Sequence, residues 1–471
     1  MEISILGILL IVFTLLFFVY KFGLQKKSIE EGYNSFFLFS IVFALLIDVG
    51  FIFSTDSFVF EYTYYFSIVC FFLALLVLFK RKMSPYFITP IVIFVFYLLT
   101  ITIVPYLMHT TYMSAEHGVV WDVYFGPNGE KMAEAGVTFD SFFIIARTFI
   151  FLVCFYALTI TLKKDNFYGW MKVLYKASWV VIVLSLVEIV ISNISSPTLF
   201  REIVTDIFGH SKATYPMSKS FKGFYPPMLF SREPSTYVLS LFIFGTNNIA
   251  YYFFHSEKRR LSTLVNLLFI VLFSLSSFSM SAVIYLAIMF LIVIYILGIN
   301  KGWLPLLIAV IAIPILLVLF KDRIANLLDT LSYFIYSNPS ELPESSEIIR
   351  LYSIYNNLKY FIQNPLFGTG VGVIYCFSSV VTLIANIGLI GLAMFVLIIS
   401  RFTNKILNSQ IVSFFTIFVF IGSFTLTGHM SLILYIDKII VMYLVCKDIN
   451  LCVLSKKPSL ASNKEVLGNA L

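Results

Sequence analysis

LVNLLFIVLFSLSSFSMSAVIYLAIMFLIVIYIL, residues 264–297, is an apolar run whose division sets the topology of the whole chain. As one helix it would be about 50 Å long at 1.5 Å per residue, too long for one membrane span and slightly short for two. Serines cluster in its middle, at positions 274, 276, 277, 279 and 281. We therefore predict two spans joined by a tight turn.

Apolar runs long enough to cross a bilayer recur through the rest of the chain, where a span needs roughly 17–25 residues. They lie near 3–20, 35–53, 62–79, 86–104, 142–162, 173–192, 236–254, 303–320, 373–399, 411–427 and 431–446. With 60% hydrophobic and only 12% charged residues, the composition excludes a soluble globular protein. The sequence predicts an all-α, polytopic integral membrane protein, a single membrane domain over 1–471 with about 13 transmembrane helices.

The distribution of basic residues predicts the orientation. With the first run, 3–20, retained as a span and the N-terminus outside, the loops expected inside carry Lys21, Lys26, Lys27, Lys80, Arg81, Lys82, Lys163, Lys164, Lys172, Lys258, Arg259, Arg260, Lys301, Arg401 and Lys405. A single span at 264–297 would place the later of these residues outside, so two spans fit better. We expect the cytoplasmic tail to be 447–471.

Three loops on the outer side are long, at about 105–141, 193–235 and 321–372. The second and third break the charge rule, because they carry Arg201, Lys212, Lys219, Lys222, Arg232, Lys321, Arg323, Arg350 and Lys359. An anionic ligand at this surface is the simplest reason for these cations. The alternative is local neutralisation by acidic neighbours such as Asp206, Glu341, Glu344 and Glu347.

Charged residues within the spans also sort towards the outer side, namely Asp48, Arg147, Glu188, Asp437 and Lys438. Intramembrane charges usually face a bundle interior or a water-filled cavity, so together they suggest a polar cavity open to the outside. The alternatives are snorkelling of Arg147 to the interface and mutual neutralisation of Asp437 and Lys438.

Residues 344–372 combine an amphipathic pattern with a glycine-rich turn. Ile348, Leu351, Tyr355, Leu358 and Ile362 form one apolar stripe, which leaves Arg350, Asn357 and Gln363 off it. Asn364-Pro365 should end this helix, and Gly368, Gly370 and Gly372 should let the backbone turn and approach a ligand. This pattern favours either the wall of an active site on the membrane surface or an interfacial helix that anchors a loop.

Residues 231–235, Ser-Arg-Glu-Pro-Ser, precede the span at 236–254. Proline is well tolerated in the first turn of a helix, and an acidic residue there is favoured by the helix dipole. These residues could therefore only cap a helix. Alternatively, Arg232 could bind phosphate and Glu233 could accept a proton from a reacting hydroxyl.

FSREPSTYVLSLF at 230–242, the outer-loop Arg350 and the turn NPLFGTG at 364–370 resemble the O-antigen polymerase family, often called Wzy. The plan of many spans and two large basic loops is also similar to the wider O-antigen ligase-like superfamily of membrane glycosyltransferases. The resemblance implies a GT-C-like enzyme of the bacterial inner membrane that works on the periplasmic face without a metal or another cofactor. Its substrates would be undecaprenyl-pyrophosphate-linked repeat units, and a chain-length regulator protein would be a possible partner.

The resemblance implies that Arg232 and Arg350 grip the pyrophosphate, whose negative charge grows as the glycosidic bond breaks. Lys222, Arg323 and Arg147 are further candidate cations. Glu233 is the candidate base, with His429 as the alternative. Tyr352, Tyr355, Gly368 and Gly370 complete the predicted substrate site, for which the outer loops offer no metal motif.

Two other functions stay open at this point. A ligase would transfer the finished glycan to lipid A-core, but ligases of this superfamily use a histidine in the late large loop, and 321–372 contains none. A flippase for lipid-linked oligosaccharides should show related halves and charges along both leaflets, and neither is evident. The short basic clusters of the inner loops exclude nucleic-acid binding.

Overall fold

The computed structural model describes residues 2–46, 51–54, 59–81, 85–107, 139–161, 164–195, 199–208, 225, 227–229, 231, 234–254, 260–277, 279–301, 357–372 and 379–403, with a few positions between 321 and 354. Within these residues the fold is almost entirely helical. The predicted spans at 303–320, 411–427 and 431–446, most of the loop at 105–141 and the tail at 447–471 lie outside them.

The described helices run in chain order as α1 (Ile5–Phe18), η1 (Val19–Leu24), α2 (Ile29–Leu46), α3 (Tyr62–Lys80), α4 (Pro85–Leu107), α6 (Phe139–Thr161), α7 (Lys164–Val190), η3 (Ile191–Ser195), α8 (Leu199–Phe208), α9 (Pro234–Phe254), α10 (Arg260–Ser276), α11 (Met280–Lys301) and α15 (Ser379–Thr403). Four of these stretches are long and apolar enough to cross a membrane, at Ile5–Leu24, Ser141–Thr161, Gly169–Ser195 and Val381–Ile398. Shorter apolar helices accompany them at Tyr64–Lys80, Ile88–Val104, Leu261–Ser276 and Ser281–Ile294. These helices indicate a multi-pass membrane protein.

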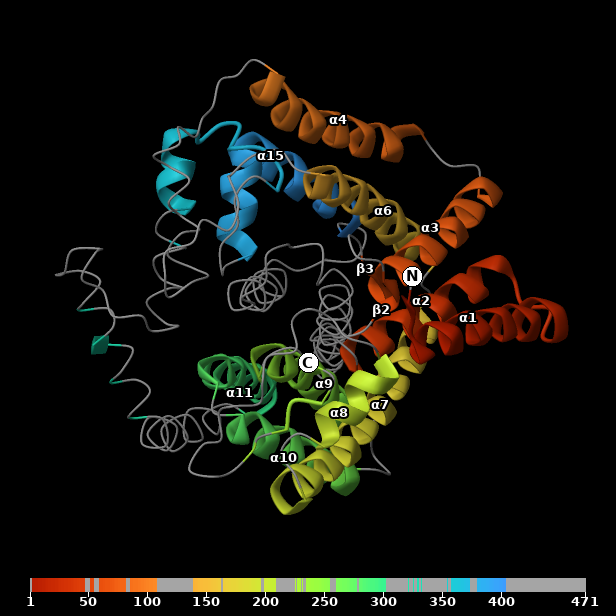
Figure 1. The fold of residues 1–471 in the computed structure, drawn as a ribbon, viewed down its shortest axis with the longest axis vertical. Helices are drawn as coiled ribbons and strands as arrows, with labels where there is room; N and C mark the ends of the chain where they lie inside the picture. Colours follow the sequence, from red (N-terminus) through yellow and green to blue (C-terminus); the bar gives the residue numbers. More distant parts are fainter. Residues whose placement is uncertain are drawn as a thin grey trace, which may run out of the picture.

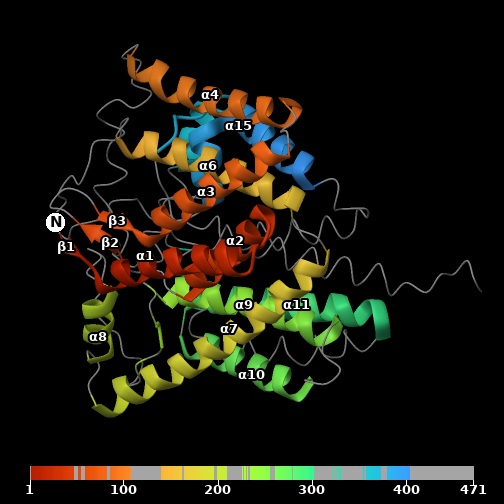
Figure 2. The same cartoon turned by 90° about the vertical axis from the view of Figure 1, so that its right-hand side faces the viewer.

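The helices form three groups that follow one another across the molecule (Figures 1 and 2). One group contains α4, α6 and α15, the middle group α1, α2 and α3, and the third α7, α9, α10 and α11. Packing of α3 on α6 joins the first group to the second, and packing of α2 on α7 joins the second to the third. Buried hydrogen bonds also tie α2 to α6. The Tyr33 hydroxyl donates to the Cys154 carbonyl at 2.6 Å, the Thr161 hydroxyl donates to Asn34 Oδ1 at 2.8 Å, and Asn34 Nδ2 donates to the Thr161 carbonyl at 3.2 Å.

A small antiparallel sheet marks one end of this bundle. Its strands are β1 (Glu2–Ile3), β2 (Phe51–Ser54) and β3 (Val59–Glu61), paired in the order β1-β2-β3. It joins the start of α1 to the start of α3, and Gly7 fits there because a Cβ at this position would lie 2.5 Å from the Ile52 carbonyl oxygen. We call this end of the bundle the sheet end.

The other end is fixed by Arg81, which follows α3. Its guanidinium donates to both carboxylate oxygens of Glu30 at the start of α2, at 2.9 and 2.7 Å, and to the Ile160 carbonyl at the end of α6. The bond with Glu30 raises the pKa of Arg81, so this cation stays charged. We call this end the Arg81 end.

The direction of α7 follows from its short connection to α6. Helix α6 ends at Thr161, at the Arg81 end, and α7 begins at Lys164. Helix α7 therefore also starts at the Arg81 end, and its last turns lie at the sheet end. Trp170 of α7 stacks on Phe37 of α2, with ring centroids 6.3 Å apart.

The predicted division of residues 264–297 into two helices is confirmed, since α10 ends at Ser276 and α11 begins at Met280. The serines make the break because Ser274, Ser276 and Ser277 each donate to a carbonyl three or four residues back, which competes with a continuous helix. The predicted span at 35–53 is wrong at both ends, because α2 covers Ile29–Leu46 and Phe51–Ser54 form β2. The aromatic and β-branched residues of Phe51–Phe53 favour a strand once they pair with β1 and β3.

Candidate functional site

The segment before α9 is held by a carboxylate from the end of α7. Glu188 is 1% exposed, and one of its oxygens accepts hydrogen bonds from the backbone amides of Met228 and Leu229, at 2.9 and 2.6 Å. Two amide donors suit an ionised carboxylate and satisfy it away from water. The sequence predicts that Glu188 faces an open polar cavity, whereas in the structure it fixes the backbone of this segment.

Asn193 in η3 holds the same segment a few residues earlier. Its side chain accepts from the Tyr225 amide at 2.9 Å and donates to the Tyr225 carbonyl at 3.1 Å, as a neighbouring strand would. At the Glu188 anchor Leu229 has a φ of 49°, an uncommon value for a residue with a side chain. The bond from its amide to Glu188 stabilises this conformation.

The first turn of α9 is fixed to α7 as well. Tyr237 and Ser185 share a buried hydrogen bond of 2.7 Å between their hydroxyls. Pro234 begins the helix, as the sequence predicts. Arg232 and Glu233 lie outside the described residues, but Ser231 and Pro234, their immediate neighbours, are both described. The contacts with α7 thus lie in the segment before α9 and in the first turn of α9.

The glycine-rich turn at 364–372 fills a break in α15. Gly388 has φ 64° and ψ −175°, which interrupts the helix. In an unbroken helix the amides of Leu389 and Ile390 would donate to the Ala385 and Asn386 carbonyls. Here the Leu389 and Ile390 amides donate to the carbonyls of Pro365 and Leu366, at 2.9 and 3.1 Å.

The turn also donates hydrogen bonds to α15. The amides of Thr369 and Gly370 donate to the Ala385 and Asn386 carbonyls, at 2.9 and 3.0 Å. The turn thus satisfies four backbone groups of α15 next to the break, the amides of Leu389 and Ile390 and the carbonyls of Ala385 and Asn386.

Glycine is needed on both sides of this contact. A Cβ on Gly388 would lie 2.3 Å from the Leu366 carbonyl oxygen, and a Cβ on Gly368 would lie 2.5 Å from the Asn386 carbonyl oxygen. Gly368 and Gly370 have φ values of 74° and 101°. Sequence reasoning assigned these glycines to close approach of a ligand, and the structure shows close approach of another backbone. Their predicted role in substrate binding stays a prediction.

Two other helices surround the turn. The Thr102 hydroxyl of α4 accepts a hydrogen bond from the Val371 amide at 3.0 Å, and the Tyr97 hydroxyl of α4 donates to the Ile387 carbonyl at 2.8 Å. Gly372 lies against α6, where an added Cβ would be 3.1 Å from Ser141 Cα. Since Ser141 is near the start of α6, the turn lies at the sheet end.

Arg147 is the candidate cation that the structure describes. It is half-buried on α6, with its guanidinium carbon 4.4 Å from the ring centroid of Tyr64 at the start of α3. Arg147 lies six residues beyond Ser141, about 9 Å along the helix at 1.5 Å per residue. Arg147 and the contact between Gly372 and Ser141 are therefore both near the start of α6.

The helix before the turn has its apolar stripe on the exposed side. It ends at Gln363, directly before Asn364-Pro365, as predicted. Its buried residues are Asn357, 0% exposed, and Tyr360, 5% exposed. Leu358 and Ile362, from the predicted apolar stripe, are 39% and 73% exposed. An exposed apolar stripe is expected when these side chains face lipid instead of a protein core.

The described candidates thus share one end of the bundle but form two groups. The 225–231 segment and the start of α9 belong with α7, while the turn and Arg147 belong with α4, α6 and α15; α1, α2 and α3 lie between the two groups in Figure 2. The structure does not bring these groups into contact through described residues. Outside the description lie Lys222, Arg323, Arg350, Tyr352, Tyr355 and His429, and also Asp48, Asp437 and Lys438.

Sequence reasoning missed two features. Helix α8 is amphipathic, with Phe200 and Val204 buried and Leu199, Ile203 and Ile207 exposed, and its spacing of three and four was visible in the loop at 193–235. A buried network of neutral polar residues joins α7, α9 and α10: Asn248 Nδ2 donates to Ser178 Oγ at 3.0 Å and to Asn266 Oδ1 at 2.7 Å. The asparagines concerned, Asn248 beside Asn247 in one apolar run and Asn266 in another, form no periodic pattern that predicts this network.

Among the residues that the structure describes, no group of three or more histidine, cysteine or acidic side chains is placed to hold a metal ion. Comparisons with protein-family models, with curated proteins and with solved structures find no match for this chain.

Proposed function

We propose that this chain is a membrane glycosyltransferase that polymerises undecaprenyl-pyrophosphate-linked oligosaccharide units into O-antigen or a similar surface polysaccharide. The supporting observation is the anchoring of the 225–231 segment and the start of α9 by Glu188, Asn193 and Ser185. Buried Glu188 holds the chain before Arg232-Glu233, and buried Ser185 holds it after this pair. Such support is expected where a charged pair must keep a fixed position during a reaction.

The chemistry assigned to the site is glycosyl transfer to an acceptor hydroxyl. The acceptor oxygen forms a bond to the anomeric carbon of the growing glycan as the bond from that carbon to the pyrophosphate oxygen breaks. Glu233 takes the hydroxyl proton, and the electron pair leaves with undecaprenyl pyrophosphate. Arg232 and Arg350 stabilise the charge on this leaving group, because fixed cations act most strongly where charge develops.

The proposal includes a topology. It has about 13 transmembrane helices in a GT-C-like arrangement in the bacterial inner membrane, with the N-terminus periplasmic and the C-terminus cytoplasmic. One observation supports it. The described candidate residues lie at the sheet end, whereas Lys80 and Arg81, which are expected inside, lie at the opposite end of the bundle. Cysteine accessibility at Lys222→Cys and Lys80→Cys tests it, and modification of both from the same side of the membrane would contradict it.

Glycan analysis of a deletion strain tests the function. We expect loss of polymer and a surface glycan with a single repeat unit, restored to a ladder by the wild-type gene. Genes that carry Arg232→Ala or Arg350→Ala should leave the deletion strain with the single-repeat glycan, although the variant protein still inserts into the membrane. As a control, Lys176→Ala on α7, whose side chain is exposed, should restore the full ladder.

The deletion strain also separates the competing functions. Polymer that accumulates on the carrier lipid would indicate a ligase. Single repeat units trapped on the cytoplasmic side would indicate a flippase. A full ladder from both arginine variants would contradict the assignment of the pyrophosphate site.

A further inference from the structure

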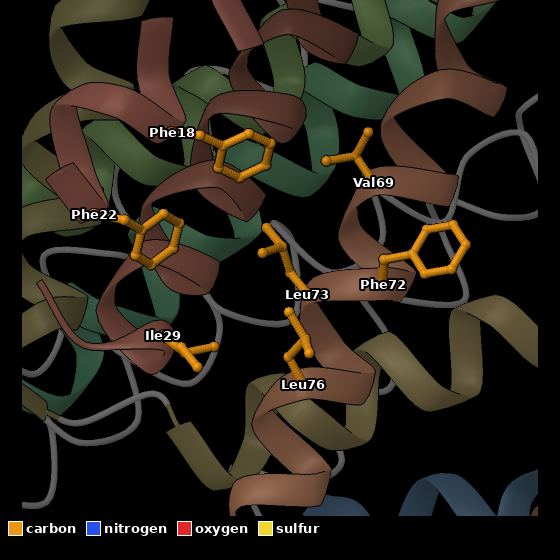
Figure 3. A pocket seen from close by; sticks show the side chains of 7 residues that line it. All are labelled: Phe18, Phe22, Ile29, Val69, Phe72, Leu73 and Leu76. Atoms are coloured by element: carbon orange, nitrogen blue, oxygen red, sulfur yellow. The ribbon is translucent and has the colours of Figure 1, made fainter. Parts of the chain in front are cut away.

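An apolar groove of about 490 Å³ lies at the surface between the α1-η1-α2 corner and α3. Figure 3 shows its two walls facing each other. Phe18, Phe22 and Ile29 form one wall, and the other is formed by Val69, Phe72, Leu73 and Leu76 of α3. The volume is in the range of ligand sites. The lining contributes no polar surface, so neither water nor a polar ligand has a hydrogen-bonding partner in the groove.

The groove faces the lipid. Phe72 and Leu76 on its rim are 61% and 51% exposed, and Leu15 and Leu16 of α1 are 61% and 62% exposed. Exposed apolar side chains at this density are unfavourable in water but normal in the hydrocarbon core of a bilayer. Chain-like apolar molecules are the available occupants there.

The wall formed by Phe18 and Phe22 is rigid. The two rings stack with centroids 5.9 Å apart, and Phe18 also stacks on Phe36 of α2. Phe22 lies directly over Gly32, where a Cβ would be 2.2 Å from its ring. The groove is therefore a fixed feature of the packing.

Charges at the Arg81 end of the groove identify the class of ligand. Lys80 follows Phe72 and Leu76 on the same face of α3, at successive steps of four residues. Lys21 of η1, the residue before Phe22, is a second cation at this end of the bundle. Two neighbouring cations are neutralised, because Lys27 pairs with Glu31 at 3.0 Å and Arg81 pairs with Glu30 at 2.7 Å. Among the described residues, neither Lys80 nor Lys21 has a carboxylate partner.

We infer that this groove binds one anionic phospholipid, with an acyl chain between the two walls and the phosphate near Lys80 and Lys21. An apolar slot that ends at two cations complements a molecule with a hydrocarbon chain and a negative headgroup. This inference does not depend on the proposed glycosyltransferase activity, and it concerns the end of the bundle opposite the candidate site.

Native mass spectrometry of the purified full-length protein tests this inference. The protein is mixed with equal amounts of phosphatidylglycerol and phosphatidylcholine that have identical acyl chains. We expect one tightly held lipid per chain, with phosphatidylglycerol preferred by about fivefold, the contribution of one lysine at a membrane surface. Equal retention of the two lipids would overturn the inference.

Two pairs of variants separate the groove from general membrane affinity. Lys80→Gln should abolish the preference for phosphatidylglycerol, whereas Lys176→Gln, an exposed lysine of α7, should keep it. Leu76→Trp fills the groove and should remove the bound lipid, whereas Ile68→Trp, on α3 outside the groove, should not. Both tryptophans lie on lipid-exposed positions, so both variants should fold.

Three results would assign the groove to another occupant and overturn the inference. The first is loss of lipid that is equal in Leu76→Trp and Ile68→Trp. The second is displacement of phosphatidylglycerol by an equal amount of polyprenyl phosphate. The third is a dimer that Leu76→Trp converts to a monomer.

Discussion

Removal of the Glu188 carboxylate tests how the start of α9 is held. The carboxylate is 1% exposed and accepts hydrogen bonds from the Met228 and Leu229 amides. In Glu188→Ala these two amides lose their acceptor, at a cost of roughly 1–3 kcal/mol each. We expect the free energy of unfolding to fall by about 2–6 kcal/mol, summed over the two donors. In Glu188→Gln one oxygen can still accept both bonds, and only the charge is lost, so we expect a cost of about 1–2 kcal/mol.

Hydrogen exchange read by mass spectrometry reports the local effect, and thermal unfolding in detergent reports the global one. Glu188→Ala should speed exchange of the Met228 and Leu229 amides by at least about 30-fold, which corresponds to roughly 2 kcal/mol. Glu188→Gln should give a smaller increase. Glu202→Ala, at an exposed position of α8, is the matched control and should leave exchange at 228–229 unchanged. Equal exchange in Glu188→Ala and wild type would refute the anchoring role.

Three further predictions concern the helix packing. Gly388→Ala should destabilise the protein by at least about 3 kcal/mol in thermal unfolding, because the backbone conformation of Gly388 is open almost only to glycine. The control Gly169→Ala, with nothing within 4 Å of the added Cβ, should be neutral. Equal stability of the two variants would contradict the backbone hydrogen bonding described at the break in α15. Asn248→Leu should cost about 1–2 kcal/mol, since it removes two interhelical hydrogen bonds, and an unchanged melting temperature would show that these bonds contribute nothing. A double-mutant cycle of Arg81→Ala and Glu30→Ala should give a coupling of up to about 1 kcal/mol that falls at high salt; additive losses would mean that this exposed pair is not a stabilising contact.

The division of residues 264–297 could be predicted because it depends on length and local chemistry. A helix of that length does not fit one span, and the serines between Ser274 and Ser281 supply local hydrogen bonds that end a helix. The end of the helix at Gln363 was equally local, since proline at 365 acts on its immediate neighbours.

The partner of the glycine-rich turn could not be predicted. Glycines at positions 368 and 370 indicate positive φ angles and close approach of another group, but the sequence does not identify that group. The answer depends on Gly388, some 20 residues later, and on the pairing of the turn with the broken α15. Long-range backbone pairing of this kind leaves no periodic signal.

The role of Glu188 could not be predicted from the sequence either. A lone acid in an apolar run indicates a buried polar partner, and we inferred a cavity from it. Its partners are backbone amides of Met228 and Leu229, which every residue except proline carries, so no pattern of side chains could reveal them. The exposed stripe of Leu358 and Ile362 shows a similar limit: the apolar face was found, but in a membrane that face need not be the buried one.

Chain extension by the purified protein tests the central claim most directly. The full-length protein is reconstituted into vesicles with an undecaprenyl-pyrophosphate-linked oligosaccharide, and the glycan lengths are read by mass spectrometry. The account predicts products of two or more repeat units with release of undecaprenyl pyrophosphate, and only the starting unit with Arg232→Ala. Products of equal length from wild type and Arg232→Ala, or no product from an intact wild-type protein, would contradict it.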